Sequence, residues 1–165
     1  MTHRINSACK LFLFLAIWCY VSTSFAGGGH KHSHHDASAS AVGNPTKPSE
    51  STRLIKVSAS DDMRFKFSRE LNLNDGDVIT FVISNKGKVP HEFSIGNEKE
   101  QKNHQIMMRK NPSMVHSDGN SVTIKPGETK KLTWKFKGDG LVVFACNIPG
   151  HYEAGMYKKV RIDSK

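Results

Sequence analysis

A thiolate, an imidazole and a thioether lie close together near the end of the chain, in the segment Cys146-Asn-Ile-Pro-Gly-His151-Tyr-Glu-Ala-Gly-Met156. Pro149 and Gly150 favour a turn between the cysteine and the histidine, so the two side chains can converge on one ion from a single loop. Two imidazoles, one thiolate and a weak axial thioether form a ligand set that accommodates both oxidation states of copper. The segment therefore indicates a copper site with Cys146, His151 and Met156 as three of its ligands.

The second imidazole must come from another part of the chain, and His91 is the best candidate. Pro90 stiffens the approach to this histidine, and the strand predicted to follow it fixes the direction of its side chain. Zinc is the main rival occupant, because cysteine and histidine suit it as well. A single histidine or methionine is more often packed or solvated than bound to metal, so the prediction depends on the four residues occurring together.

The first 26 residues have the features of a secretory signal peptide. Arg4 and Lys10 precede the apolar run 11–21, and the small residues Ser24 and Ala26 offer a cleavage site. The apolar run is too short for a membrane anchor, which needs about 20 apolar residues. We therefore expect export to the periplasm, cleavage near Ala26 or one residue later, and no membrane anchor.

Removal of the signal peptide would leave Cys146 as the only cysteine, since Cys9 and Cys19 lie within it. A lone thiol in an oxidising compartment has no internal disulfide partner and is at risk of oxidation unless something occupies it. A metal ion would occupy it. A buried, inert cysteine is the alternative explanation.

The chain is strongly basic, with a formal net charge of +9. This charge favours acidic protein partners or anionic surfaces. Nucleic acid is not an expected partner, because the compartment is wrong and the basic residues are scattered along the predicted strands.

Residues 27–51 form a tail rich in Gly, Ser, His and Pro, and we expect it to be disordered because it has too few large apolar residues to build a core. Its histidines could bind copper, nickel or zinc with little specificity. They are His30, His32, His34 and His35. An engineered affinity tag would look similar, but the interruptions by Lys31 and Ser33 favour a native segment.

Residues 52–165 have the pattern of one all-β domain. Short runs of alternating or β-branched residues recur between turn signals, and about eight strands in this length suit an antiparallel sandwich. The predicted strands are 54–59, 63–67, 78–84, 92–95, 121–124, 129–136, 141–145 and 157–162.

One long loop insertion, 96–120, interrupts this rhythm, although 101–110 could form a short helix. Its soft and borderline donors are His104, Met107, Met108, Met114 and His116. Thioethers suit Cu(I), so a second, weaker copper site is one interpretation of this loop. In the other interpretation, Met107 and Met108 face inward and cap the sandwich.

The spacing of Cys146, His151 and Met156, with the upstream pair Pro90-His91, resembles the cupredoxins, and the resemblance covers about 54–165. It implies a Greek-key β-sandwich with type 1 copper at one end, near the surface. Within that family, the chain is most similar to periplasmic cupredoxins linked to copper tolerance. This similarity lies in the segments 62–65, 91–93 and 146–156 and in the methionines and histidines of the loop insertion 96–120.

Glu92 departs from the pattern of many electron-carrying cupredoxins, which have an asparagine after the first histidine. That asparagine helps to tie the two ligand loops together. A carboxylate at this position could lower the reduction potential of the copper or compete with Met156 for the axial position.

The resemblance and the ligands together favour a periplasmic copper-binding protein that sequesters or hands on copper. The alternative is a small electron carrier. For either function, the expected protein partner is a periplasmic redox or copper-trafficking protein. An enzyme is not expected, because copper oxidases use further copper centres and usually another domain, whereas this chain offers one domain with one clear site. A dinuclear purple-copper site would need a second cysteine in the ligand loop.

Overall fold

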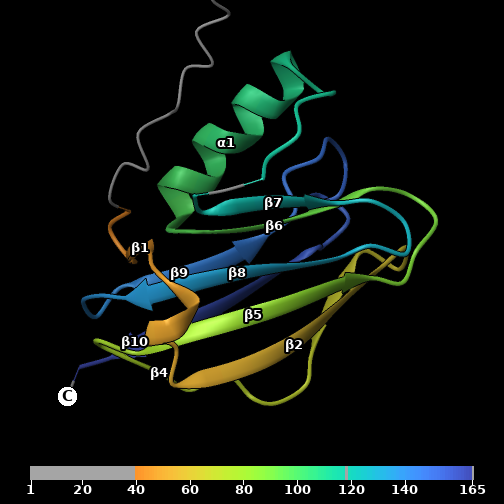
Figure 1. Cartoon of the computed structure of the whole chain (residues 1–165). Helices are drawn as coiled ribbons and strands as arrows, with labels where there is room; N and C mark the ends of the chain where they lie inside the picture. The colour runs from red at the N-terminus through yellow and green to blue at the C-terminus, as the bar shows by residue number, and fades with distance from the viewer. Residues whose placement is uncertain (1–39, 118, 165) are drawn as a thin grey trace, which may run out of the picture. The chain divides into compact units, whose positions relative to one another are not determined.

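Two five-stranded sheets face each other in the computed structural model, which describes residues 40–117 and 119–164 (Figure 1). Their strand orders are β1-β8-β5-β2-β3 and β4-β10-β9-β6-β7. The strands are β1 (Gly43–Pro45), β2 (Arg53–Ser60), β3 (Arg64–Phe67), β4 (Leu73–Asn74), β5 (Val78–Asn85), β6 (His91–Gly96), β7 (Ser121–Ile124), β8 (Thr129–Phe136), β9 (Leu141–Ala145) and β10 (Tyr157–Asp163). The predicted all-β Greek-key sandwich is confirmed, and each of the eight predicted strands is present to within one residue at either end. The sandwich is not wholly antiparallel as predicted, because β2 pairs with β5, and β4 with β10, in parallel.

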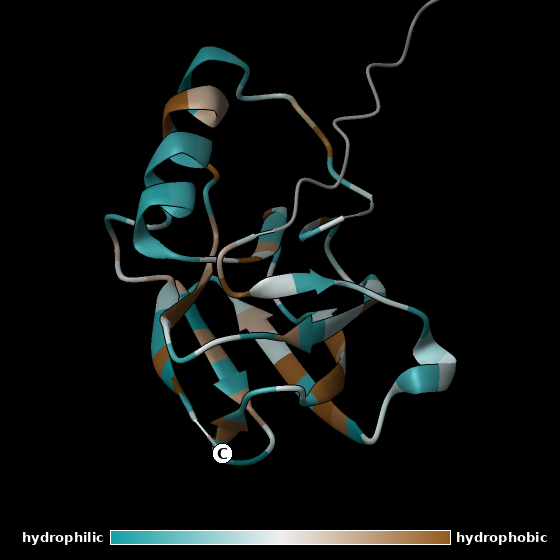
Figure 2. Ribbon diagram, turned by 90° about the vertical axis from the view of Figure 1, so that its left-hand side faces the viewer, coloured by the Kyte–Doolittle hydropathy of each residue, from teal (hydrophilic) through white to brown (hydrophobic). Residues whose placement is uncertain are grey.

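The core lies between the two sheets and is rich in aromatic side chains. Phe93 of β6 stacks on Phe144 of β9 with ring centroids 5.6 Å apart, and Phe81 of β5 approaches both rings from the opposite sheet. Figure 2 shows hydrophobic residues concentrated on the strands, whereas the helix is mostly hydrophilic. Each buried Phe contributes roughly 1.5–3 kcal/mol, so this cluster holds β6 and β9 firmly in place.

Helix α1 (Glu98–Lys110) occupies most of the first half of the predicted loop insertion and packs against β6 and β9. It begins with a capping box, in which Asn97 accepts from the Glu100 backbone N–H and Glu100 accepts from the Asn97 backbone N–H. Met108 is buried, so the inward-facing interpretation is correct for this methionine. None of the helices among the described residues is long and apolar enough to span a membrane.

The predicted disorder of 27–51 is wrong for residues 40–51, which belong to the folded part of the chain. β1 pairs with β8, and the Trp134 indole N–H donates to the Val42 carbonyl at 3.2 Å. A Cβ on Gly43, whose φ is +130°, would lie 2.0 Å from the Lys135 carbonyl oxygen, so only glycine allows this close approach. The segment is held by backbone pairing and one buried valine, which a count of large apolar residues does not detect.

The signal peptide and residues 27–39 of the predicted tail lie outside the described residues, and so do the four tail histidines.

Candidate metal centre

The structure brings His91, Cys146 and His151 together at one end of the sandwich. One ligand atom from each of the three side chains lies within 4.8 Å of the others. The Cys146 sulfur is 3.3 Å from His151 Nδ1, and the rings of His91 and His151 have centroids 5.2 Å apart. β6 and β9 are antiparallel neighbours in the same sheet. His91 at the start of β6 and Cys146 directly after β9 therefore lie at the same end of the sheet.

The ring of His91 is oriented by Asp61. His91 is fully buried, and its Nε2 lies 3.2 Å from Asp61 Oδ1, which makes Nε2 the protonated nitrogen. Nδ1 is buried as well and has no hydrogen-bond partner. A carboxylate that holds the far nitrogen of a histidine in this way is typical of metal sites. The unpaired Nδ1 is therefore available to a metal ion.

Met156 completes the group from the end of the ligand loop. Its side chain is fully buried and packs in one small cluster with Cys146 and Ala59. Two backbone hydrogen bonds hold the loop, one from the Cys146 N–H to the Met156 carbonyl and one from the Met156 N–H to the His151 carbonyl, both 3.0 Å long. The three predicted ligands from this loop therefore lie at one end of the sandwich.

Arg64 of β3 braces the same loop from the other sheet. Its guanidinium donates to the Ala154 carbonyl at 2.7 Å and lies against Gly155. A Cβ on Gly155 would lie 2.6 Å from Arg64 Nη1, and the φ of +100° at this residue is strained for any other amino acid. The turn that leads to Met156 thus depends on glycine.

Burial keeps the free Cys146 thiol protonated at neutral pH. It raises the pKa of Cys146 to about 12, although the backbone N–H groups of Glu92 and Ile148 oppose the shift. The Glu92 N–H lies 3.3 Å from the sulfur. Burial, and secondarily the charge of His91, lowers the pKa of His151. A metal ion bound by this cysteine would therefore displace the thiol proton.

Glu92 lies next to these residues but does not point at them. Successive side chains of a strand point to opposite faces, so Glu92 is directed away from the side on which His91 lies. Its Oε1 accepts from the backbone N–H and the side-chain amide of Asn147, at 3.4 and 3.2 Å. The carboxylate is thus engaged elsewhere, and the expected competition with Met156 is not supported.

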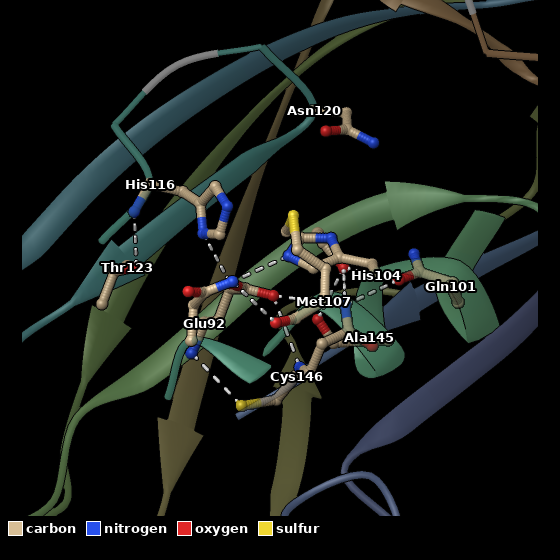
Figure 3. A network of polar contacts seen from close by, with 12 residues as sticks. Glu92, Gln101, His104, Met107, His116, Asn120, Thr123, Ala145 and Cys146 are labelled. Carbon is tan, nitrogen blue, oxygen red and sulfur yellow. Dashed lines mark hydrogen bonds and ion pairs between the residues drawn. The ribbon is translucent and has the colours of Figure 1, made fainter. Parts of the chain in front are cut away.

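A second group of metal-binding side chains surrounds the other Glu92 oxygen (Figure 3). Oε2 lies 2.9 Å from His116 Nδ1 and 3.5 Å from His104 Nε2. Burial by itself would raise the pKa of Glu92, but the two histidines lower it to about 2. The sequence predicted that His104 and His116 could share a site, but it did not predict Glu92 as their partner.

The three methionines of the loop insertion have different environments. Met108 is packed in the interior, whereas Met107 and Met114 are partly exposed. Met107 follows His104 by three residues, which places it on the same face of α1, and Figure 3 shows it beside that histidine. The predicted five-residue accessory site is therefore not a single cluster, because Met108 belongs to the core.

Comparison with known proteins adds to this geometry. The family model described as "Copper binding proteins, plastocyanin/azurin family" matches residues 52–163. A copper-resistant cuproprotein CopI from Vibrio cholerae is 40% identical over 166 residues, which cover 93% of this chain and 98% of that protein. A protein of the same description from Rubrivivax gelatinosus is 35% identical over 147 residues, covering 86% of this chain and 88% of that one.

Among solved structures, the fold is similar to that of an auracyanin from Roseiflexus castenholzii. The TM-score is 0.57 at 19% identity, and the match covers 68% of this chain and 98% of that chain. At this identity the likeness concerns the fold alone.

Proposed function

Because this chain belongs to the plastocyanin/azurin family of copper-binding proteins, we propose that it holds one type 1 copper ion through His91, Cys146, His151 and Met156 and acts in copper resistance. The observation that carries the proposal is the convergence of Cys146 Sγ with one nitrogen from each histidine within 4.8 Å. The relatives in Vibrio cholerae and Rubrivivax gelatinosus, named copper-resistant cuproproteins, support the biological role.

The donor set fits copper better than zinc. A fully buried methionine beside the thiol supplies a soft thioether, which is common at type 1 copper and is not a usual zinc ligand. Copper bound here would supply a one-electron redox couple and a strong thiolate bond. The chain provides the rest: Asp61 orients His91, and the Glu92 N–H donates to the sulfur and stabilises its negative charge.

The proposed activity is binding rather than turnover. Three ligands come from a loop that is closed by its own backbone hydrogen bonds, and the fourth comes from a strand in the sheet core. Such a frame accepts copper with little rearrangement. We further propose that the protein is exported to the periplasm, where excess copper would be captured, and that residues 1–26 are removed on export.

Addition of Cu(II) to the purified mature protein tests the site. An intense visible thiolate-to-copper band is expected at one equivalent, and Cys146→Ser should abolish it. A protein that binds Zn(II) in preference to copper, or that remains colourless with Cu(II), would contradict the proposal. Cell fractionation, with sequencing of the mature amino terminus, tests export.

A small electron carrier is the second candidate, and the exposure of His151 favours it. This residue is the one proposed ligand that is partly exposed, so a redox partner could dock over it. Deletion of the gene separates the two functions. Copper sensitivity with normal respiration is expected for resistance, whereas a respiratory defect with normal copper tolerance would indicate electron carriage.

A further inference from the structure

The pair of histidines on the loop insertion meets a fully buried carboxylate, and this cluster is distinct from the group around Cys146. We propose that Glu92, His104 and His116 form a second metal site, which takes a borderline divalent transition-metal ion and binds Cu(II) most tightly. The proposal goes beyond the type 1 site, because none of its three ligands belongs to that site.

The first argument is that the cluster contains metal-binding atoms without hydrogen-bond partners. Glu92 Oε2, His104 Nε2 and His116 Nδ1 are all buried, and none of them makes a hydrogen bond of acceptable geometry. Their separations of 2.9 and 3.5 Å are short enough for ion pairs, but the atoms are not aligned as donors and acceptors. Burying a carboxylate in this way is costly unless a cation compensates it. A metal ion would satisfy all three atoms at once.

The second argument is that the three side chains are already held in place. The His116 backbone N–H donates to Thr123 Oγ1, and its carbonyl accepts from the Thr123 N–H, both at 2.9 Å. His104 is fixed by helix α1, and Asn147 holds the other oxygen of Glu92. The two imidazole rings lie with centroids 4.8 Å apart. A prearranged site of this kind loses little conformational freedom when the ion binds.

The donor chemistry selects the ion. Two imidazole nitrogens and one carboxylate oxygen suit Cu(II) and Zn(II), and the general order of affinities places Cu(II) above Zn(II). A soft Cu(I) ion would prefer thioethers, yet Met108 is packed in the core. Figure 3 shows Met107 beside the cluster, but its thioether is not needed to complete the three-ligand set. The site is therefore expected to favour the divalent ion.

The test uses the full chain with Cys146→Ser, to remove the type 1 site, and with the four tail histidines replaced by alanine. In this background we expect one equivalent of Cu(II) to bind and to give a tetragonal electron paramagnetic resonance signal with coupling to two imidazole nitrogens. His104→Phe, His116→Phe and Glu92→Gln should each weaken Cu(II) binding by roughly tenfold or more. Asn103→Ala, at an exposed position of the same helix, is the matched control and should bind as the background does.

Circular dichroism of each variant shows whether it folds, and only folded variants are compared. If the background chain binds no Cu(II), if it binds Cu(I) alone, or if the folded histidine variants keep full affinity, the cluster is a structural ion-pair network and the proposal is wrong. The two proposals can fail separately. If the chain that keeps Cys146 shows the visible thiolate band but binds no second equivalent of Cu(II), only the second site is disproved. If the second-site signal appears but the chain with Cys146 shows no thiolate band, only the type 1 site is disproved.

Discussion

Glu92 Oε1 accepts a hydrogen bond from the Asn147 side-chain amide at 3.2 Å, which joins the residue after His91 to the residue after Cys146. In the cupredoxins that this sequence resembles, an asparagine on the histidine side helps to tie the two ligand segments together. Here the amide lies on the cysteine side and the acceptor on the histidine side. Glu92 and Asn147 thus link the two ligand segments in this protein, and the second Glu92 oxygen faces the two histidines.

Replacement of Asn147 by alanine removes this tie and should destabilise the protein by about 1–3 kcal/mol, because buried Glu92, Ser94 and Gln101 each lose a hydrogen bond from the side-chain amide. Chemical denaturation of the metal-free protein measures the change in unfolding free energy. Asn44→Ala, at an exposed position, is the control and should change it by less than about 0.5 kcal/mol. Equal effects of the two substitutions would contradict the role given to Asn147.

Asp61→Asn should raise the reduction potential of bound copper without changing the amount of copper bound. The carboxylate on His91 Nε2 makes that ligand more basic, which favours the Cu(II) state, and a neutral amide does so less. Voltammetry of the loaded protein measures the shift. Asp62→Asn is a closely matched control, because it removes the same charge from the neighbouring residue. The Asp62 carboxylate contacts Ser60 and Lys66 and not His91. Equal shifts in both variants would show a general charge effect.

The raised pKa of Cys146 predicts how the stability of the metal-free protein depends on pH. The thiol ionises near pH 9 when unfolded but only near pH 12 when folded, so its contribution is complete below pH 9 and is lost as the pH rises toward 12. Between pH 7 and pH 10 this contribution should fall by about 1 kcal/mol. Denaturation of the wild-type and Cys146→Ser proteins at both pH values isolates the effect. A difference between the two proteins that is independent of pH would contradict it.

Met156→Leu should keep the copper but alter its electronic state. Leucine nearly preserves the buried volume, so the cost in unfolding free energy should be below about 1.5 kcal/mol. Loss of the axial thioether should raise the reduction potential and shift the visible band. Absorption spectroscopy and voltammetry of the loaded variant measure both changes. A spectrum identical to that of the wild type would show that Met156 is only a packing residue.

The strands and the group around Cys146 could be predicted because each leaves a local signal. Period-two alternation and turn residues marked the eight main strands, and the Pro-Gly turn between Cys146 and His151 indicated convergence. The helix start could also have been placed more accurately, since Asn97 and Glu100 have the spacing of a capping box.

Glu92 was missed as a partner of His104 and His116 for a physical reason. Every residue of β6 is buried, because α1 covers one face of the strand and the core covers the other. The face of β6 that carries Glu92 and Ser94 is polar yet buried, and the sequence alone does not reveal whether such a face meets solvent or a distant loop. Segment 40–51 was missed because backbone pairing, which is nearly independent of side-chain type, holds it in place.

The hydrogen bond from the Cys146 N–H to the Met156 carbonyl closes the ligand loop at its own base, where β9 and β10 begin their ladder. Apart from the brace of Arg64 at Ala154 and Gly155, the loop between these two residues is therefore anchored to the sandwich mainly at its base. Substitutions that avoid this brace can alter the ion preference with less effect on folding stability than substitutions in the sheets.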